Sequence, residues 1–549
     1  MNLTSHLVQR MMRLDPPSTR DLAADRDLRV PMPDGTVLLA DRYAPREGGQ
    51  GLPLALIRCP YGRRGPFAAG LARPLAERGF QVLLQSVRGT FGSGGTFDPM
   101  RRDREDGLAT LEWVVKQPWF GDSIVLCGLS YLGYVQWAVA DSLPPAVKAI
   151  VPQVTDSALT LEFLRSDGLS LETPFVWGVL IAGQERRGAF LRQGLQARKT
   201  QRALRTLPLR DADVAAMGRR SSYIQDVLAC DADHPRWAGI DHRDRVAGVT
   251  VPVSSVAGWY DIFLPGQLRD FTALQEAGRP ARLTVGPWTH ASTDTFRAGL
   301  REILEFGLPW AGGGAPPSRA PVRLFVMGEE AWRDFPSWPP PGYAPRRYHL
   351  QPDGALSVEP PPGEPSPGES SPGDPAPDRY RYDPADPTPA IGGARMVRDT
   401  GRVDNGTLEA RPDVLTFTTG PLEASVEVIG EVSAEIWFRS TLPYADVFVR
   451  LCDVDPDGRS RNVCDGLVSL TGADAVNRAV VRLWPTAHRF KPGHRIRVQV
   501  SSGAFPRYAR NPGTGEPHPT ATRLLAADQE VYHDPAHPSA IVLPVRQAP

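Results

Sequence analysis

One serine of the chain stands where a nucleophile could be exposed on a tight turn. Ser130 lies in the stretch CGLSYLGY, between Gly128 and Gly133. Residues 124–126 form an apolar run typical of a buried strand, and a helical pattern begins near Leu132. A nucleophile elbow needs this succession of strand, turn and helix, because the glycines permit the sharp turn that exposes the hydroxyl. The alternative is an ordinary Gly-Ser turn that leads into a helix.

A serine hydroxyl is a weak nucleophile without a base, and two later stretches could supply the missing groups. In α/β-hydrolases an acid and then a histidine follow the serine, each at the end of a later strand. Asp261 follows the apolar stretch VPVSSVAGWY, and His290 follows RLTVGPWT. The other histidines precede these strands or lie in the C-terminal part of the chain, so His290 alone has the required position.

Together these residues predict acyl transfer through a covalent intermediate. Ser130 attacks a carbonyl, His290 takes its proton and returns it to the leaving group, and Asp261 orients and stabilises the imidazolium. The backbone N–H of Tyr131 donates to the oxyanion, and water then hydrolyses the acyl-enzyme. Taken singly, Asp261 could be a turn carboxylate and His290 a loop histidine. Their order and their places at strand ends favour the triad.

A largely parallel sheet is needed to bring these residues together, and the chain has the corresponding rhythm. Strand-like and helix-like stretches alternate through residues 1–155 and again through 241–320, which predicts an α/β-hydrolase core in two parts. Residues 156–240 are helical, and we expect them to form a cap at the carboxyl end of the sheet. Short strands in residues 321–549 predict a β jelly-roll, with a Pro-rich insert at 352–390 that we expect to be a surface spacer.

The composition of the chain limits the kinds of partner that we expect. The chain has 549 residues, and its 62 basic residues balance 62 acidic ones without a block of like charge, so we expect no nucleic-acid or membrane partner. Five scattered cysteines form no C-x-x-C pair, and no apolar run reaches the length of a membrane span. We therefore expect a cytoplasmic protein with no cofactor and no metal. The sequence leaves open whether the protein forms a homodimer.

The one stretch with the spacing of a calcium loop is DVDPDGRSRNVCDG, which contains Asp453, Asp455 and Asp457. It lacks a glutamate at the twelfth position and lies between predicted strands. The sequence therefore favours a turn over a metal site.

Four further stretches carry a family resemblance: RCPYGRR, GLSYLGY, GWYDIF and GPWTH. Together they resemble the CocE/NonD hydrolases, the S15-type serine hydrolases that include X-Pro dipeptidyl-peptidases and cocaine esterase. The resemblance implies three domains: an α/β-hydrolase core, a helical cap and a galactose-binding-like jelly-roll. It also implies that a tyrosine hydroxyl is the second oxyanion donor, and the matching residue is Tyr61. The alternative for Tyr61 is a packed aromatic residue in a loop.

The residues after the predicted acid bear on the substrate. Ile262, Phe263 and Leu264 are apolar, so a buried substrate ammonium would lack a partner charge beside Asp261. This argues against an α-amino ester or a free peptide N-terminus, although Glu162 or Asp167 in the cap could substitute.

Aromatic side chains near these motifs could instead line an apolar acyl pocket, and we expect Phe263, Trp177 and Trp259 to do so. The predicted substrate is therefore a small carboxylic ester with an apolar or aromatic acyl group. Amide or peptide hydrolysis and acyl transfer to another acceptor are the enzymatic alternatives. A binding module with a vestigial hydrolase core is the alternative outside enzymes.

Overall fold

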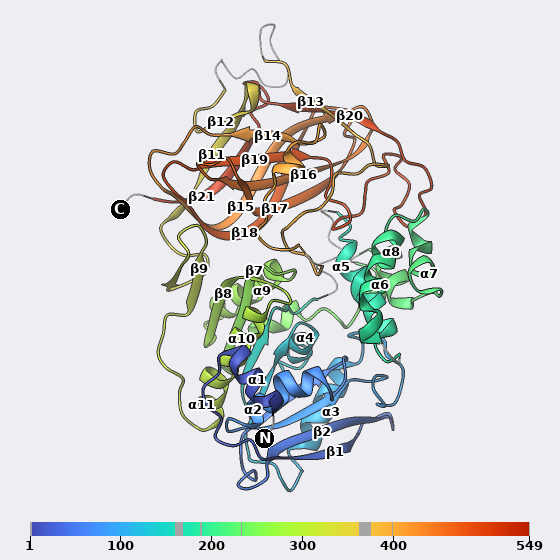
Figure 1. The fold of residues 1–549 in the computed structure, drawn as a ribbon, viewed down its shortest axis with the longest axis vertical. Helices are drawn as coiled ribbons and strands as arrows, with labels where there is room; N and C mark the ends of the chain where they lie inside the picture. Colours follow the sequence, from blue (N-terminus) through green and yellow to red (C-terminus); the bar gives the residue numbers. More distant parts are fainter. Residues whose placement is uncertain are drawn as a thin grey trace.

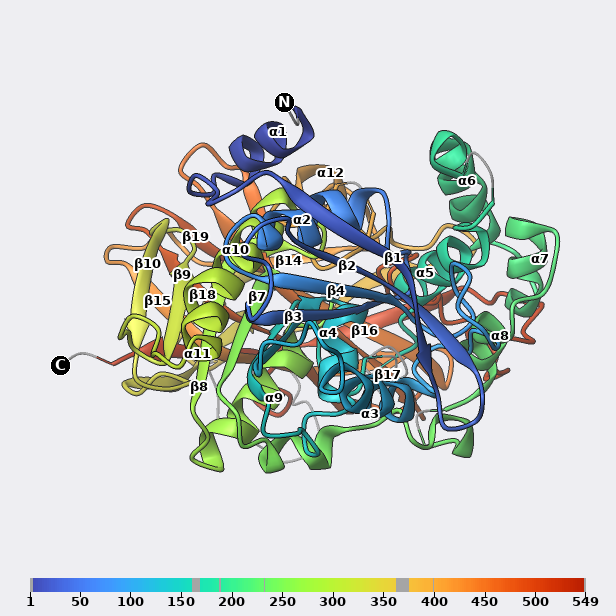
Figure 2. The ribbon, with the colours of Figure 1, turned by 90° about the horizontal axis from the view of Figure 1, so that it is seen from below.

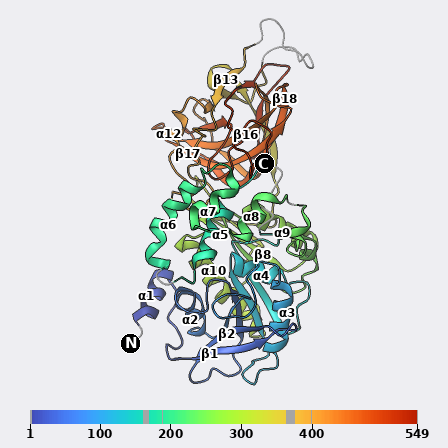
Figure 3. The ribbon, with the colours of Figure 1, turned by 90° about the vertical axis from the view of Figure 1, so that its right-hand side faces the viewer.

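Two sheets organise the chain. The computed structural model describes residues 3–159, 168–186, 189–231, 233–361, 375–397 and 399–547. A sheet with helices on both faces forms one end of the molecule, and an antiparallel β domain forms the other (Figure 1). A group of helices lies beside the junction of the two (Figures 1 and 3). None of the helices in the described part of the chain is long and apolar enough to cross a membrane.

The first sheet has ten strands in the order β1-β2-β4-β3-β5-β6-β7-β8-β9-β10. They are β1 (Leu22–Pro31), β2 (Val37–Pro45), β3 (Leu54–Cys59), β4 (Gln81–Ser86), β5 (Ile124–Leu129), β6 (Val147–Gln153), β7 (Val253–Tyr260), β8 (Ala281–Thr289), β9 (Val322–Val326) and β10 (Ala331–Phe335). Strands β4, β3 and β5 to β9 run parallel, whereas β1 and β2 form an antiparallel hairpin that turns at Pro33, Asp34 and Gly35. The twist of this sheet is visible from below (Figure 2).

Helices cover both faces of this sheet, so its central strands β3, β4, β5 and β7 are buried along their whole length. They are α1 (Leu3–Met12), α2 (Arg73–Ala76), α3 (Asp103–Val114), α4 (Tyr131–Trp137), α9 (Leu264–Glu276), α10 (Thr293–Glu302) and α11 (Leu308–Ala311). Alternate side chains of β3 pack on opposite faces of the sheet. Ala55 and Ile57 pack in one core with α2 and α10, and Leu54 and Leu56 pack in another with α3 and α9. The predicted α/β-hydrolase core is confirmed.

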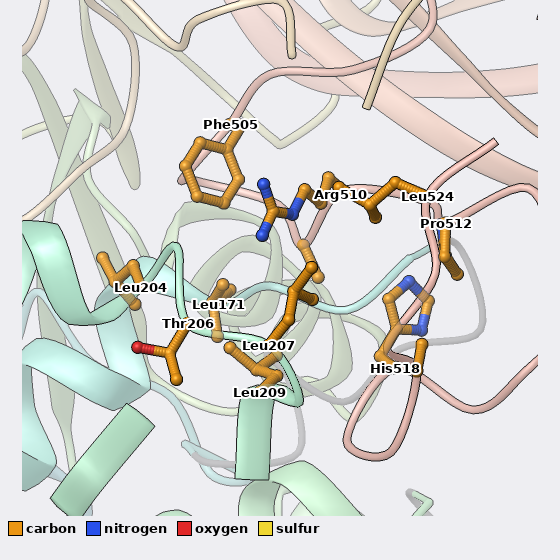
Figure 4. A pocket seen from close by; sticks show the side chains of 12 residues that line it. Leu171, Leu204, Thr206, Leu207, Leu209, Phe505, Arg510, Pro512, His518 and Leu524 are labelled. Atoms are coloured by element: carbon orange, nitrogen blue, oxygen red, sulfur yellow. The ribbon is translucent and has the colours of Figure 1, made fainter. Parts of the chain in front are cut away.

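The cap consists of α5 (Glu172–Gly183), α6 (Ala189–Ala203), α7 (Ala212–Met217) and α8 (Ser222–Ala229). These helices lie between the core and the β domain (Figure 3) and project to one side of the sheet (Figure 2). An apolar cavity marks their contact with the β domain, where Leu171 and Leu204 face Phe505 and Pro512 (Figure 4). The cap also contacts the core, because the Gln184 side-chain amide at the end of α5 donates to the Pro60 carbonyl at 2.9 Å.

The β domain is a jelly-roll, as predicted, and its sheet contains eleven strands in the described part of the chain. It contains β11 (Tyr343–Gln351), β12 (Ala355–Ser357), β13 (Asp378–Tyr382), β14 (Leu415–Thr418), β15 (Val426–Ser440), β16 (Tyr444–Val454), β17 (Ser460–Thr471), β18 (Asn477–Phe490), β19 (Arg495–Ser501), β20 (Ala527–Tyr532) and β21 (Ala540–Arg546), with the short helix α12 (Gly406–Glu409). The DPDG stretch is a turn, because the Asp455 carboxylate accepts hydrogen bonds from the backbone N–H groups of Asp457 and Arg459.

Two stretches differ in detail from the expectation for residues 321–549. Strands β9 and β10 pair with the ten-stranded sheet and extend it to Phe335, and the first strand of the jelly-roll sheet is β11, which begins at Tyr343. The expected spacer at 352–390 contributes β12 and β13, and Tyr382 is buried in the jelly-roll core. Residues 362–374 of that stretch lie outside the described residues.

One carboxyl group in the jelly-roll should make stability depend on pH. Asp446 is buried, and burial raises its pKa to about 6 although the Asn511 amide donates a hydrogen bond to it at 2.9 Å. The folded state therefore binds this proton more tightly than the unfolded state does. The free energy of unfolding should fall by about 3 kcal/mol in total as the pH rises from the unfolded pKa through the folded one.

Asp446→Asn should remove this contribution, because the amide does not ionise. Calorimetric melting at about pH 4 and about pH 7 should show a smaller loss of stability in the variant than in the wild type. Asp528→Asn, at an exposed position of β20, is the control and should behave as the wild type. Equal pH dependence in all three proteins would contradict the prediction.

Candidate active site

The turn at Ser130 has the backbone of a nucleophile elbow. Ser130 joins β5 to α4 with φ +56° and ψ −125°, a strained conformation for a residue with a side chain. Gly128 and Gly133 must be glycines because there is no room for a side chain at either position. A Cβ on Gly128, whose φ is +143°, would lie 2.6 Å from the Leu132 Cβ, and one on Gly133 would lie 2.3 Å from the Thr155 Cγ2. The elbow therefore needs both glycines.

The structure brings Ser130, Asp261 and His290 together. His290 Nδ1 lies 2.7 Å from the Asp261 Oδ2, and His290 Nε2 lies 3.0 Å from the Ser130 Oγ. An ionised carboxylate only accepts hydrogen bonds, so Nδ1 donates to Asp261 and Nε2 is left to accept the serine proton. Asp261 is fully buried, and its Oδ1 accepts the backbone N–H of Phe263 at 2.8 Å. This arrangement can activate the serine as a nucleophile.

Tyr61 follows β3 and contacts the cap. Its hydroxyl accepts a hydrogen bond from the indole N–H of Trp177 at 2.9 Å, and its ring stacks on Phe67. Burial raises the pKa of Tyr61, so its hydroxyl keeps its proton. The Trp177 ring also stacks on Tyr131, the residue after the serine, with ring centres 6.0 Å apart. Tyr61 and Tyr131 thus belong to one aromatic cluster beside the elbow.

Tyr131 is fixed by contacts that the sequence does not predict. Its hydroxyl donates to the Asp103 Oδ2 at 2.6 Å and accepts the backbone N–H of Met100 at 2.8 Å. The Arg58 guanidinium also donates to Asp103, to its backbone carbonyl at 2.7 Å and to its carboxylate at 3.3 Å. The acidic first turn of α3 is visible in the sequence, but nothing in it indicates a bond to a residue 28 positions away.

The aromatic residues expected to line an acyl pocket separate into two groups. Phe263 lies edge-on to the His290 ring at 5.4 Å, and Trp177 belongs to the cluster of Tyr131. Trp259 lies elsewhere, contrary to expectation: its indole N–H donates to the Phe325 carbonyl and its ring packs against β9 in another core. Strand β7 turns this side chain toward β9. The cap carboxylates Glu162 and Asp167 lie outside the described residues.

A parallel-sheet core with this Ser–His–Asp arrangement at its strand ends defines a serine hydrolase of the α/β-hydrolase fold. Residues 34–292 match the X-Pro dipeptidyl-peptidase (S15) family, and residues 317–542 match the X-Pro dipeptidyl-peptidase C-terminal non-catalytic domain. The chain is 33% identical to the cocaine esterase of Rhodococcus sp. (strain MB1 Bresler), over 94% of this chain and 98% of that protein. The chain belongs to this family, the CocE/NonD hydrolases.

Solved structures agree on the fold. An α-amino acid ester hydrolase superposes with a TM-score of 0.80 at 23% identity, covering 97% of this chain and 98% of its own. An aminopeptidase from a marine sediment archaeon, Thaumarchaeota archaeon, superposes with a TM-score of 0.79 at 22% identity, covering 96% and 97%. The whole chain, including the cap and the jelly-roll, therefore follows one three-part architecture.

The elbow gives a stability prediction. Gly128→Ala should lower the free energy of unfolding by about 2–4 kcal/mol, because the new methyl group strains the backbone and collides with Leu132. Gly70→Ala is the matched control, since a Cβ there meets no atom within 4 Å. Chemical denaturation of the two variants measures the difference, and similar stabilities would show that the elbow relaxes around the methyl group.

Proposed function

We propose that this protein hydrolyses a carboxylic ester with an apolar or aromatic acyl group through an acyl-enzyme on Ser130. The single observation that carries the proposal is the continuous hydrogen-bonded chain from Asp261 through His290 to Ser130. His290 takes the serine proton during attack and returns it to the leaving alcohol. Asp261 keeps the proton on Nδ1 and stabilises the imidazolium. A water molecule, activated by the same imidazole, then releases the acid.

The oxyanion of each tetrahedral intermediate would be held by two donors. The backbone N–H of Tyr131 is one, because it follows the nucleophile at the start of α4. The Tyr61 hydroxyl is the other, and its raised pKa keeps it a donor at neutral pH. Donors fixed in this way act mainly on the transition state, so their loss should reduce kcat rather than binding.

The ester preference rests on the surroundings of the triad. Ile262, Phe263 and Leu264 are all buried, and the Phe263 ring contacts the imidazole edge-on. These three side chains offer no charge to a substrate ammonium, which would lose hydration beside them without compensation, whereas an apolar acyl group gains from burial. The cocaine esterase relative is named for an ester substrate, which agrees with this choice.

Labelling with a fluorophosphonate tests directly whether Ser130 is a reactive nucleophile. Wild-type protein should be labelled at Ser130, and Ser130→Ala should not be labelled although it melts at the same temperature. Folded wild-type protein that takes no label would instead favour a binding module with a vestigial core.

A substrate panel then divides the enzymatic alternatives. We expect p-nitrophenyl esters of apolar and aromatic acids to be cleaved at least 100-fold more efficiently than aminoacyl or X-Pro p-nitroanilides, a difference of about 3 kcal/mol in activation free energy. Preference for the anilides would support the amide or peptide hydrolase. Ester cleavage that speeds up with an added amine or alcohol, with the acyl group found on the acceptor, would support the acyltransferase.

Tyr61→Phe tests the side-chain donor. The substitution keeps the ring and removes the hydroxyl, so kcat for a p-nitrophenyl ester should fall about 10²–10³-fold with little change in KM. Tyr444→Phe, at an exposed position of β16, is the control and should retain wild-type kcat. A Tyr61→Phe enzyme with wild-type kcat would remove Tyr61 from the oxyanion site.

A further inference from the structure

Helix α5 is attached to the jelly-roll at its first residues. The carboxylate of Glu172 is fully buried and accepts two hydrogen bonds from Arg395, at 2.7 and 2.8 Å. Arg395 lies on the segment between β13 and α12, and its guanidinium also donates to the Ala390 carbonyl at 2.8 Å. The backbone N–H of Leu171 donates to the Arg507 carbonyl at 2.8 Å. The beginning of α5 is therefore held by two separate segments of the jelly-roll.

Further along, the same helix is attached to the loop that follows β3. Trp177 donates its indole N–H to the Tyr61 hydroxyl at 2.9 Å. Gln184, at the end of α5, donates its side-chain amide to the Pro60 carbonyl at 2.9 Å. Adjacent residues of this loop are thus bound by one helix, which spans the distance between the jelly-roll and the loop.

The bond between Trp177 and Tyr61 has a fixed direction. An indole N–H is only a donor, so the Tyr61 oxygen must be the acceptor. The single proton of the Tyr61 hydroxyl consequently remains for another acceptor, and the hydroxyl cannot turn it toward Trp177. The indole plane also packs on Tyr131, which supplies the backbone donor. One cap side chain therefore contacts both residues of the proposed oxyanion hole.

The attachment to the jelly-roll resists displacement. A buried bidentate pair of arginine and carboxylate combines charge with defined geometry. If α5 moved away from Arg395, the buried Glu172 carboxylate would lose its ion pair and keep the neutral amide of Gln201, at 3.0 Å, which is strongly unfavourable for a buried charge.

We propose that α5 couples the jelly-roll to the oxyanion hole, with Arg395 and Trp177 as positioning residues for the Tyr61 hydroxyl. Arg395 acts through Glu172 and the helix, and Trp177 acts by its indole N–H. The inference rests on the proposed function, because it takes Tyr61 to be an oxyanion donor. It assigns to the C-terminal domain a part in setting the catalytic geometry.

Trp177→Phe is the first test, because phenylalanine keeps an aromatic ring against Tyr131 and loses the N–H. We expect kcat for a p-nitrophenyl ester to fall about 10-fold or more, with KM within about two-fold of wild type. In a Tyr61→Phe background the same substitution should cause no further loss, since its target is gone. Trp437→Phe on β15 of the jelly-roll is the control and should leave kcat unchanged.

A residue that merely lines an acyl pocket would behave differently. Trp177→Phe would then raise KM, and its effect would multiply with that of Tyr61→Phe. Either result would overturn the role of Trp177.

The second test addresses the jelly-roll attachment. Arg395→Met should lower kcat without a matching change in KM, and the loss should again vanish in the Tyr61→Phe background. Arg411→Met breaks another bidentate pair in the jelly-roll, to Asp413, and is the matched control with wild-type kcat.

Arg395→Lys tests the same coupling if the methionine variant does not fold, because lysine preserves the charge beside Glu172 and loses the bidentate geometry. It should show the same pattern with a smaller loss. A folded Arg395 variant with wild-type kcat, or one whose loss persists without the Tyr61 hydroxyl, would overturn the coupling.

Fluorophosphonate labelling separates the two levels of failure. Wild-type protein without label at Ser130 would refute the proposed function itself. Labelled wild-type protein, with Tyr61→Phe impaired and the Trp177 and Arg395 variants unimpaired, would refute the coupling alone.

Discussion

The placement of His290 between Asp261 and Ser130 is the constraint on which the rest of the structure depends. Strands β7 and β8 run parallel, and their register shifts between Gly258 and Tyr260 so that Tyr260 pairs with Thr289. The extra residue on β8 brings Asp261 and His290, which follow the paired residues, side by side. A Cβ on Gly258 would lie 2.4 Å from the Trp288 carbonyl oxygen, so this bulge needs a glycine opposite it.

The triad could be predicted from sequence because each of its members follows a recognisable strand. Parallel strands place their carboxyl ends at one edge, so the order of Ser130, Asp261 and His290 along the chain was sufficient to bring them together. The placement of Trp259 could not be predicted in the same way. Whether a side chain near a strand end faces the site or another part of the core depends on local register, and here Trp259 packs against β9, which lies beyond β8 in the sheet.

Long-range contacts explain the other differences. The stretch VRLFVMG, residues 322–328, fits a strand of either sheet, and its pairing with β8 places β9 in the ten-stranded sheet. Glu172 and Arg395 are 223 residues apart, and each alone is an ordinary charged residue in a helical or irregular segment. Their pairing follows from how the cap packs between core and jelly-roll, which no local pattern records. Domain classes could therefore be predicted, whereas the contacts between domains could not.

The two proposed oxyanion donors differ in what is needed to hold them. The Tyr131 N–H belongs to the elbow backbone and is fixed wherever β5 and α4 are fixed. The Tyr61 hydroxyl is at the end of a side chain on a loop, and rotation about its C–O bond could aim its proton in several directions. Such a donor needs a partner that orients it before the substrate arrives. The core sheet does not provide that partner; an inserted helix does, and the jelly-roll anchors the helix. Because the triad lies in the core and the partner of the Tyr61 hydroxyl is held from the jelly-roll, the catalytic domain has a physical reason to keep contacts with a domain that contributes no member of the triad.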